Sequence, residues 1–163
     1  PPLSLGDRLY IGSFDGRLYA VPRSDEGRGW SVSFDKEHWI WGTPATDGER
    51  IFAADVMGNV YAVDAESGAE LWVRALGESV RLGLSVDPTG KYLLVASNAG
   101  TLYALDPDTG EVRWSKPETG QIGSMVVHGD WVYISRIYGE KRVQALRIED
   151  GRLQWAFSPP ESE

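Results

Sequence analysis

Residues 102–114 read LYALDPDTGEVRW, and three other stretches of the chain follow the same pattern. These are LYAVPRSDEGRGW at 18–30, VYAVDAESGAELW at 60–72 and a more divergent copy, VQALRIEDGRLQW, at 143–155. Each stretch ends in tryptophan, and the successive tryptophans are 42, 42 and 41 residues apart. A fixed period of this size indicates one supersecondary unit that is repeated four times.

Each repeat is predicted to form four short β-strands. Asp-Gly dipeptides such as 15–16 and 47–48 favour tight turns between the apolar runs. Runs such as YLLVA (92–96) and LYAL (102–105) are apolar throughout, as in strands buried on both faces. A small sheet covered on both sides by its neighbours is a blade of a β-propeller. We therefore predict an all-β fold: a single domain over 1–163, with four-stranded blades at about 1–34, 35–76, 77–116 and 117–158.

A large aromatic residue stands at the same place in every repeat. Such residues are predicted to pack between adjacent blades, where one ring buries roughly 150–250 Å². The alternative is an aromatic that contacts a ligand. The predicted packing set is Trp30, Trp72, Trp114 and Trp155, together with Tyr19, Tyr61 and Tyr103.

Composition excludes several classes of partner. The formal net charge is −8, and such a surface repels phosphate backbones and anionic membranes, so we expect no nucleic acid partner. No apolar run approaches 18 residues, so we expect no direct insertion into a membrane. The chain has no cysteine, which removes disulfides and thiolate chemistry. Its Pro-Pro start, without Met, is interpreted as that of a processed or excised piece.

The repeats MGNVYAVDAESGAELW (57–72) and AGTLYALDPDTGEVRW (99–114) resemble the PQQ-type propeller repeat. That repeat occurs in quinoprotein dehydrogenases and in non-enzymatic relatives, including the outer-membrane-assembly lipoprotein propeller of bacteria. The fourth copy departs from it, with Gln144 at the Tyr position and Arg147 at the Asp position. The resemblance covers the whole chain and implies a periplasmic or extracellular location. It is specific for fold and weak for function, because the motif encodes blade packing.

Propellers of the resembled family usually have seven or eight blades. Four blades in an open arc would expose one apolar blade face at each end, and such patches mark interaction sites. Self-association could complete an eight-blade ring from two copies of the chain. The chain could instead be half of a longer natural protein, or the four blades could close alone with strong curvature. We favour the ring of two copies.

The resemblance to quinoprotein dehydrogenases implies a Ca²⁺ held by Glu, Asn and Asp, an Asp base and often a vicinal disulfide. The chain lacks cysteine, and Asn59 and Asn98, its only asparagines, are expected in turns away from the propeller axis. His38 and His128, the only histidines, have no second metal ligand at a useful spacing. We therefore predict no catalytic, cofactor-binding or metal-binding residues, no cofactor and no enzymatic activity.

The connector KEHWIW (36–41) between the first two blades is unusually aromatic. Connectors of this kind line one mouth of a propeller, and exposed aromatics are typical interaction anchors. We predict partner binding by His38, Trp39 and Trp41; the alternative is that Trp39 or Trp41 fills a gap between blades. A second candidate is Arg136 with Tyr138, at the start of the turn YGEK (138–141). The alternative is that this turn is a solvated hairpin that binds no partner.

The predicted function is a non-catalytic scaffold that contacts a protein partner whose identity the sequence does not give. Two alternatives are a ligand-sensing ectodomain of a signalling protein and a fragment of a PQQ-dependent dehydrogenase.

Overall fold

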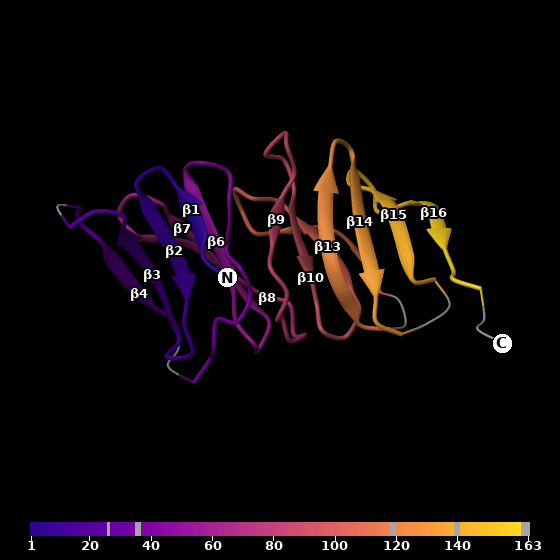
Figure 1. Cartoon of the computed structure of the whole chain (residues 1–163), viewed down its shortest axis with the longest axis horizontal. Helices are drawn as coiled ribbons and strands as arrows, with labels where there is room; N and C mark the ends of the chain where they lie inside the picture. Colours follow the sequence, from indigo (N-terminus) through magenta and orange to yellow (C-terminus); the bar gives the residue numbers. More distant parts are fainter. Residues whose placement is uncertain (26, 35–36, 118–119, 139–140, 161–163) are drawn as a thin grey trace.

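The protein is an all-β array of four separate sheets (Figure 1). The computed structural model describes residues 1–25, 27–34, 37–117, 120–138 and 141–160. Within these ranges every regular element is a strand, and each sheet holds four antiparallel strands in chain order. The predicted fold class of four four-stranded blades is thereby confirmed. Lys36 of the aromatic connector and the middle of the turn 138–141 lie outside the described residues.

The four strands of each blade lie side by side in chain order, with the first strand on the inner side of the arc and the fourth on the outer side. Their bounds in blade 1 are β1 (Leu3–Leu5), β2 (Arg8–Gly12), β3 (Arg17–Pro22) and β4 (Trp30–Ser33). Blade 2 has β5 (Ala45–Thr46), β6 (Arg50–Ala54), β7 (Asn59–Asp64) and β8 (Glu70–Ala75). Blade 3 has β9 (Ser85–Val86), β10 (Leu93–Ala96), β11 (Leu102–Leu105) and β12 (Val112–Lys116). Blade 4 has β13 (Ile122–His128), β14 (Trp131–Arg136), β15 (Val143–Arg147) and β16 (Leu153–Phe157).

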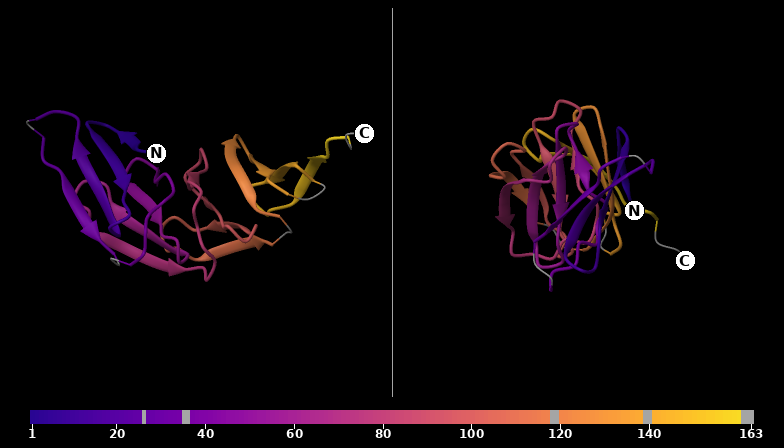
Figure 2. Two further views of the ribbon diagram at one scale, coloured as in Figure 1. Left: turned by 60° about the horizontal axis from the view of Figure 1, so that its bottom comes forward. Right: turned by 90° about the vertical axis from the view of Figure 1, so that its left-hand side faces the viewer.

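The blades follow one another along an open arc, with blades 1 and 4 at opposite ends (Figure 2). Each pair of neighbouring blades encloses one apolar core, so the described residues form three such cores. The middle strands supply most of their side chains because both faces of these strands are covered. All four residues of β10, for example, are buried. The outer strand β8 alternates between exposed and half-buried residues, as a strand with one solvated face does.

The tryptophan of each blade docks on the next blade wherever a next blade exists. Trp114 shows the arrangement: its Nε1 donates a hydrogen bond to the carbonyl oxygen of Ile148 at 2.8 Å. A Cβ built on Gly151 would lie 2.8 Å from the Trp114 ring, and Gly151 has a φ of +68°. Both the turn and the close approach of the ring therefore require glycine. The same contacts join Trp30 to Ala65 and Gly68, and Trp72 to Pro107 and Gly110.

The two ends of the arc correct the predicted packing set. Trp155 of the last blade is 46% exposed and contacts only Tyr133 of its own sheet among the described aromatic rings, at 6.1 Å between centroids. Tyr19 of the first blade alternates with the buried Leu18 and Ala20, so its side chain faces the open side of the sheet. Neither residue packs between blades, because no neighbouring blade covers its face.

The other two tyrosines of the set lie at blade junctions. Tyr61 stacks on Phe34 of blade 1 with 3.9 Å between ring centroids. Tyr103 packs against the core between blades 2 and 3.

Candidate protein-interaction surface

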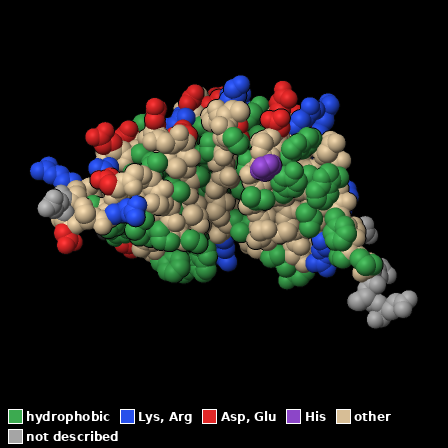
Figure 3. Space-filling model, turned by 45° about the horizontal axis from the view of Figure 1, so that its top comes forward, with side chains coloured by type: hydrophobic (Ala, Val, Ile, Leu, Met, Phe, Trp, Pro, Cys, Tyr) green, Lys and Arg blue, Asp and Glu red, His purple; other side chains and the backbone are tan. Residues whose placement is uncertain are grey.

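The two long edges of the arc differ in character. One edge is formed by the turns after the first and third strands of each blade, and Figure 3 shows acidic and basic side chains along it. We call it the charged edge. The opposite edge is formed by the turns after the second strands and by the connectors between blades. Apolar side chains gather there, at the lower margin of the view in Figure 3.

Four large apolar side chains on this second edge are here called the aromatic surface: Phe14, Trp39 and Trp41, whose rings form a cluster, and Met57, in the neighbouring turn, where Val56 N donates to the Trp39 carbonyl oxygen at 2.9 Å. Their exposed fractions are 59%, 48%, 48% and 59%. The Phe14 ring lies 5.6 Å from that of Trp39 and 5.0 Å from that of Trp41, measured between centroids. The guanidinium of Arg81 sits over the Trp41 ring at 5.9 Å. The tryptophans are therefore part of an exposed patch, and no apolar core encloses them.

Ile40 fixes the two tryptophans in this orientation. Its side chain is 1% exposed, and its backbone nitrogen donates to the carbonyl oxygen of Ser13 at 3.0 Å. The Ile40 side chain covers Gly12 so closely that a Cβ on Gly12 would lie 2.3 Å from it. Because Ile40 is anchored inward in an extended connector, its neighbours Trp39 and Trp41 point outward.

His38 supports the aromatic surface from beneath. Its Nδ1 lies 3.1 Å from Oδ2 of Asp55, whose side chain is 1% exposed. The same oxygen accepts hydrogen bonds from the Tyr61 hydroxyl and the Asn59 amide, both at 2.8 Å. The Asp55 carboxylate also accepts the backbone N–H of Met57, which places that turn beside the connector. The structure thus gives His38 a positioning role; direct contact of His38 with a partner stays a prediction.

Arg136 corrects the second candidate. It is 5% exposed, and its Nε donates to Oε1 of Gln144 at 2.9 Å. Its Nη1 donates to the carbonyl oxygens of Gly120, at 2.6 Å, and Gly100, at 3.2 Å. Gln144, at the Tyr position of the repeat, is fully buried, and its amide oxygen requires a donor. Arg136 fills that need, so the prediction that it contacts a partner is wrong. Tyr138 is 65% exposed and remains a candidate.

Phe14 and Met57 were absent from the predicted site. Both lie in turns after second strands, at 13–16 and 55–58, and each of these turns also contains an Asp and a Gly. A large apolar residue in such a turn is the signal that could have identified them. The sequence does not show that two turns and one connector from two blades meet at one place.

Two further observations concern chemistry and membranes. Among the described residues, no group of three or more His, Asp or Glu side chains is arranged to hold a metal ion. No helix capable of crossing a bilayer occurs in the described part of the chain.

Four-stranded blades joined by tryptophan contacts define the chain as a β-propeller array. The family model PQQ_2, described as outer membrane protein assembly factor BamB, matches residues 15–87 and 56–163. The chain therefore belongs to this family of PQQ-like propellers, as its repeats indicate.

Solved structures share the fold. BamB from Moraxella catarrhalis superimposes with a TM-score of 0.80 at 22% identity, over 96% of this chain and 47% of the other. A europium-containing methanol dehydrogenase gives 0.77 at 18% identity, over 96% and 41%. The Pan2 WD40 domain of Neurospora crassa gives 0.77 at 14% identity, over 97% and 51%. The chain thus spans about half the length of these structures. None of the curated proteins compared with the chain matches it.

Proposed function

We propose that the protein is a non-catalytic scaffold that binds another protein through the aromatic surface. One observation carries this proposal: the Phe14 ring contacts the rings of both Trp39 and Trp41, while each of the three side chains stays about half exposed. Tryptophan is enriched among the residues that dominate binding energy at interfaces. Contiguous exposed apolar patches often mark interaction sites.

The family supports a protein as the partner. Its description is that of an assembly factor for outer membrane proteins. The resemblance to a methanol dehydrogenase, at 18% identity, concerns the fold alone. We infer that the partner is a component of the machinery that the family description names, and that it offers an apolar segment to the aromatic surface.

Capture of the partner tests the proposal. The chain is immobilised and exposed to detergent-solubilised envelope proteins of the organism that encodes it. Captured proteins are identified by mass spectrometry and compared with those held by the double variant Phe14→Ser, Trp41→Ser. We expect an outer membrane assembly component to bind the unaltered chain and to be lost from the variant.

The matched control is the double variant Trp155→Ser, Phe157→Ser, which removes exposed aromatics of similar size from blade 4. It should retain the assembly component. If both double variants retained the assembly component equally, the proposed surface would be wrong. If no envelope component bound the unaltered chain, the proposed function would be wrong.

A cofactor assay tests the non-catalytic part of the proposal. PQQ together with Ca²⁺ should neither raise the melting temperature nor support dye-linked oxidation of an alcohol. A positive result in either assay would establish the dehydrogenase alternative.

We also propose that two copies of the chain associate through their end blades. The open face of blade 4 carries Tyr133, Ala145 and Trp155, a cross-strand row matching Tyr10, Ala20 and Trp30. The latter row covers blade 2, so the same row in blade 4 is suited to cover another blade. Blade 1 offers the complementary apolar face, but Glu26 stands in the sequence where blades 2–4 have the docking glycine. The contact is therefore expected to be weaker than those within the chain.

Light scattering across a range of concentrations tests this association. A mass approaching twice the 18.0 kDa monomer at high concentration is expected. Trp155→Ser should lower that mass, whereas Trp39→Ser, on the aromatic surface, should leave it unchanged. A monomer at all concentrations would rule out the ring of two copies.

A further inference from the structure

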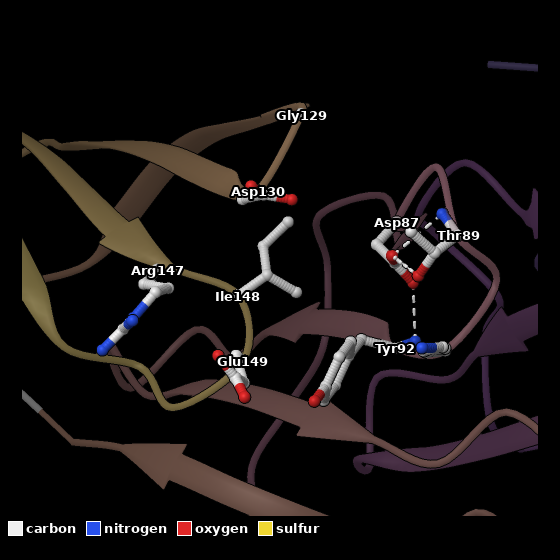
Figure 4. A pocket seen from close by; sticks show the side chains of 9 residues that line it. Asp87, Thr89, Tyr92, Gly129, Asp130, Arg147, Ile148 and Glu149 are labelled. Carbon is white, nitrogen blue, oxygen red and sulfur yellow. Dashed lines mark hydrogen bonds between the residues drawn. The ribbon is translucent and has the colours of Figure 1, made fainter.

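The charged edge contains a groove between blades 3 and 4, on the side of the arc opposite the aromatic surface. Its volume is about 340 Å³. Asp87, Lys91 and Tyr92 line it from blade 3, and Asp130, Ile148 and Glu149 line it from blade 4. Figure 4 shows Asp87 and Tyr92 on one side of the groove and Asp130, Ile148 and Glu149 on the other. A groove of about 410 Å³ also lies at the junction of blades 1 and 2, but there an arginine, Arg8, is one of the lining side chains.

An arginine bridges each of the other two junctions at the equivalent place. Arg8 of blade 1 donates from Nη1 to the carbonyl oxygens of Ala65, at 3.2 Å, and Glu66, at 2.8 Å. Arg50 of blade 2 donates from Nη1 to the carbonyl oxygen of Pro107, at 2.7 Å, and to Oδ1 of Asp108, at 2.6 Å. A guanidinium therefore binds the turn of the following blade twice in succession.

Tyr92 stands at this position in blade 3. The strand register establishes the equivalence. Arg50 immediately precedes Ile51, which pairs with Val63, and Tyr92 immediately precedes Leu93, which pairs with Leu105. Val63 and Leu105 hold the same position in their repeats. The guanidinium of Arg113 lies over the Tyr92 ring, 5.4 Å from the ring centroid. Arg113 itself forms an ion pair with Asp106. Because this position, just before β10, holds a tyrosine, it provides no guanidinium to the turn of blade 4.

The acceptors that bind an arginine elsewhere are still present at this junction. The carbonyl oxygen of Ala65 accepts hydrogen bonds from Arg8, Tyr10 and Trp30. The equivalent oxygen of Ile148 accepts only the Trp114 indole within the described residues. A carbonyl oxygen has two lone pairs, so Ile148 can accept a further donor.

Glu149 adds a carboxylate at the position of Asp108, the residue that binds Arg50. In the described part of the chain, no hydrogen bond reaches the Glu149 carboxylate.

The other charged groups of the groove favour a cation. Asp87 accepts hydrogen bonds from the backbone nitrogens of Thr89 and Tyr92, so it serves its own turn. Arg147 is paired with Asp150 at 2.8 Å. Among all the residues that line the groove, three carboxylates (Asp87, Asp130 and Glu149) stand against two cations (Lys91 and Arg147), and Arg147 also interacts electrostatically with Glu149.

We propose that this groove binds the guanidinium of an arginine side chain from a protein partner. One Nη1 of a guanidinium can donate to the Ile148 carbonyl oxygen and the Glu149 carboxylate together, as Arg50 Nη1 does with Pro107 and Asp108 at the preceding junction. A lysine ammonium has one nitrogen only, whereas Arg50 uses its Nε and Nη2 to pair with Asp47 at the same time. The site is separate from the aromatic surface and does not depend on the function proposed for it.

A titration followed by ¹⁵N–¹H NMR tests the site, with the blocked peptide acetyl-Gly-Arg-Gly-amide as the probe. Shifts are expected to centre on the amides of residues 147–151 and of Tyr92, with a Kd on the order of 1 mM for so small a ligand. The lysine analogue should bind more weakly. Glu149→Gln should weaken binding roughly fivefold through loss of one charge-assisted hydrogen bond.

Two variants sharpen the test. Glu66→Gln makes the same change of charge at the equivalent turn of blade 2, where Arg8 already occupies the acceptors, and should leave the Kd unchanged. Tyr92→Arg supplies the guanidinium from within the chain and should abolish binding of the peptide.

Three results would overturn the proposal. Equal affinity for the arginine and lysine peptides would show a general attraction to cations. An equal loss in Glu66→Gln and Glu149→Gln would show an effect of net charge. Binding of free L-arginine at least as tight as that of the blocked peptide would indicate a small molecule in place of a protein partner.

Discussion

The indole of Trp114 and the carbonyl oxygen of Ile148 join two blades through one hydrogen bond of 2.8 Å. The ring of Trp114 also covers Gly151, in the turn that Ile148 begins. One side chain of the outer strand thus fixes both the distance and the orientation of the following blade. The same pair of contacts recurs at each of the three described junctions.

Truncation of this tryptophan should destabilise the fold. Trp114→Ala leaves a cavity at the junction and an unpaired acceptor, and we expect a loss of about 3–5 kcal/mol in the free energy of unfolding. Trp155→Ala is the control, because Trp155 is 46% exposed and covers no blade. It should cost about 1 kcal/mol or less in monomeric protein. Urea denaturation of both variants measures the difference, and equal losses would contradict the docking role of Trp114.

The glycine beneath the tryptophan can be tested separately. Gly151→Ala places a Cβ 2.8 Å from the Trp114 ring, in addition to forcing a side chain into a φ of +68°. Gly90→Ala imposes a similar backbone cost at a φ of +72° but meets no atom within 4 Å. We expect losses of about 1–2 kcal/mol for Gly90→Ala and roughly 2–4 kcal/mol for Gly151→Ala. Thermal denaturation should rank them in that order; the reverse order would mean that the ring adapts without cost.

The sequence predicts the architecture well because the repeat encodes it locally. The 42-residue period, the tryptophan and the turn residues belong to one supersecondary unit, and stacking that unit requires little further information. The ends of the arc were predicted less well. Trp155 ends its repeat as Trp114 does, but no following blade covers it, and the repeat motif does not show whether such a blade is present.

The candidate site was predicted in part. The aromatic connector is visible in the sequence, whereas its contact with Phe14 depends on how two blades meet. Arg136 was predicted to contact a partner because it begins a basic and aromatic stretch that includes Tyr138, Lys141 and Arg142. Its burial follows from a change elsewhere: Gln144 replaces the tyrosine of the repeat and leaves a polar group in the sheet that needs a partner.

Arg136 should therefore behave as a structural residue. Arg136→Ala removes donors from Gln144, Gly100 and Gly120 within a buried region, and we expect a loss of roughly 3 kcal/mol. Arg142→Ala, which removes an exposed arginine six residues away, should change stability by about 0.5 kcal/mol or less. Chemical denaturation distinguishes the two variants. A neutral Arg136→Ala would return Arg136 to the candidates for partner binding.

Acid should weaken the fold through carboxylates that support the turns of the charged edge. Burial of Asp47 by itself raises the pKa of its carboxyl, but hydrogen bonds from the backbone nitrogens of Arg50 and Glu49 and from the Arg50 guanidinium outweigh it, so the pKa is lowered from 3.8. A carboxyl with a lower pKa in the folded state stabilises the fold above the pKa of the unfolded chain. That contribution is lost as the pH falls through the folded value.

The melting temperature should accordingly change little between neutral pH and about pH 5, then fall below about pH 4. Asp47→Asn keeps an acceptor for the turn but gives up the charge that pairs with Arg50 at 2.6 Å. It should melt below the unaltered chain at pH 7, and the gap should close at about pH 2, where the Asp47 carboxyl is increasingly protonated. Melting curves of both proteins across this range measure the gap. A gap that stays constant with pH would mean that the substitution acts through packing and that the Asp47 charge contributes nothing.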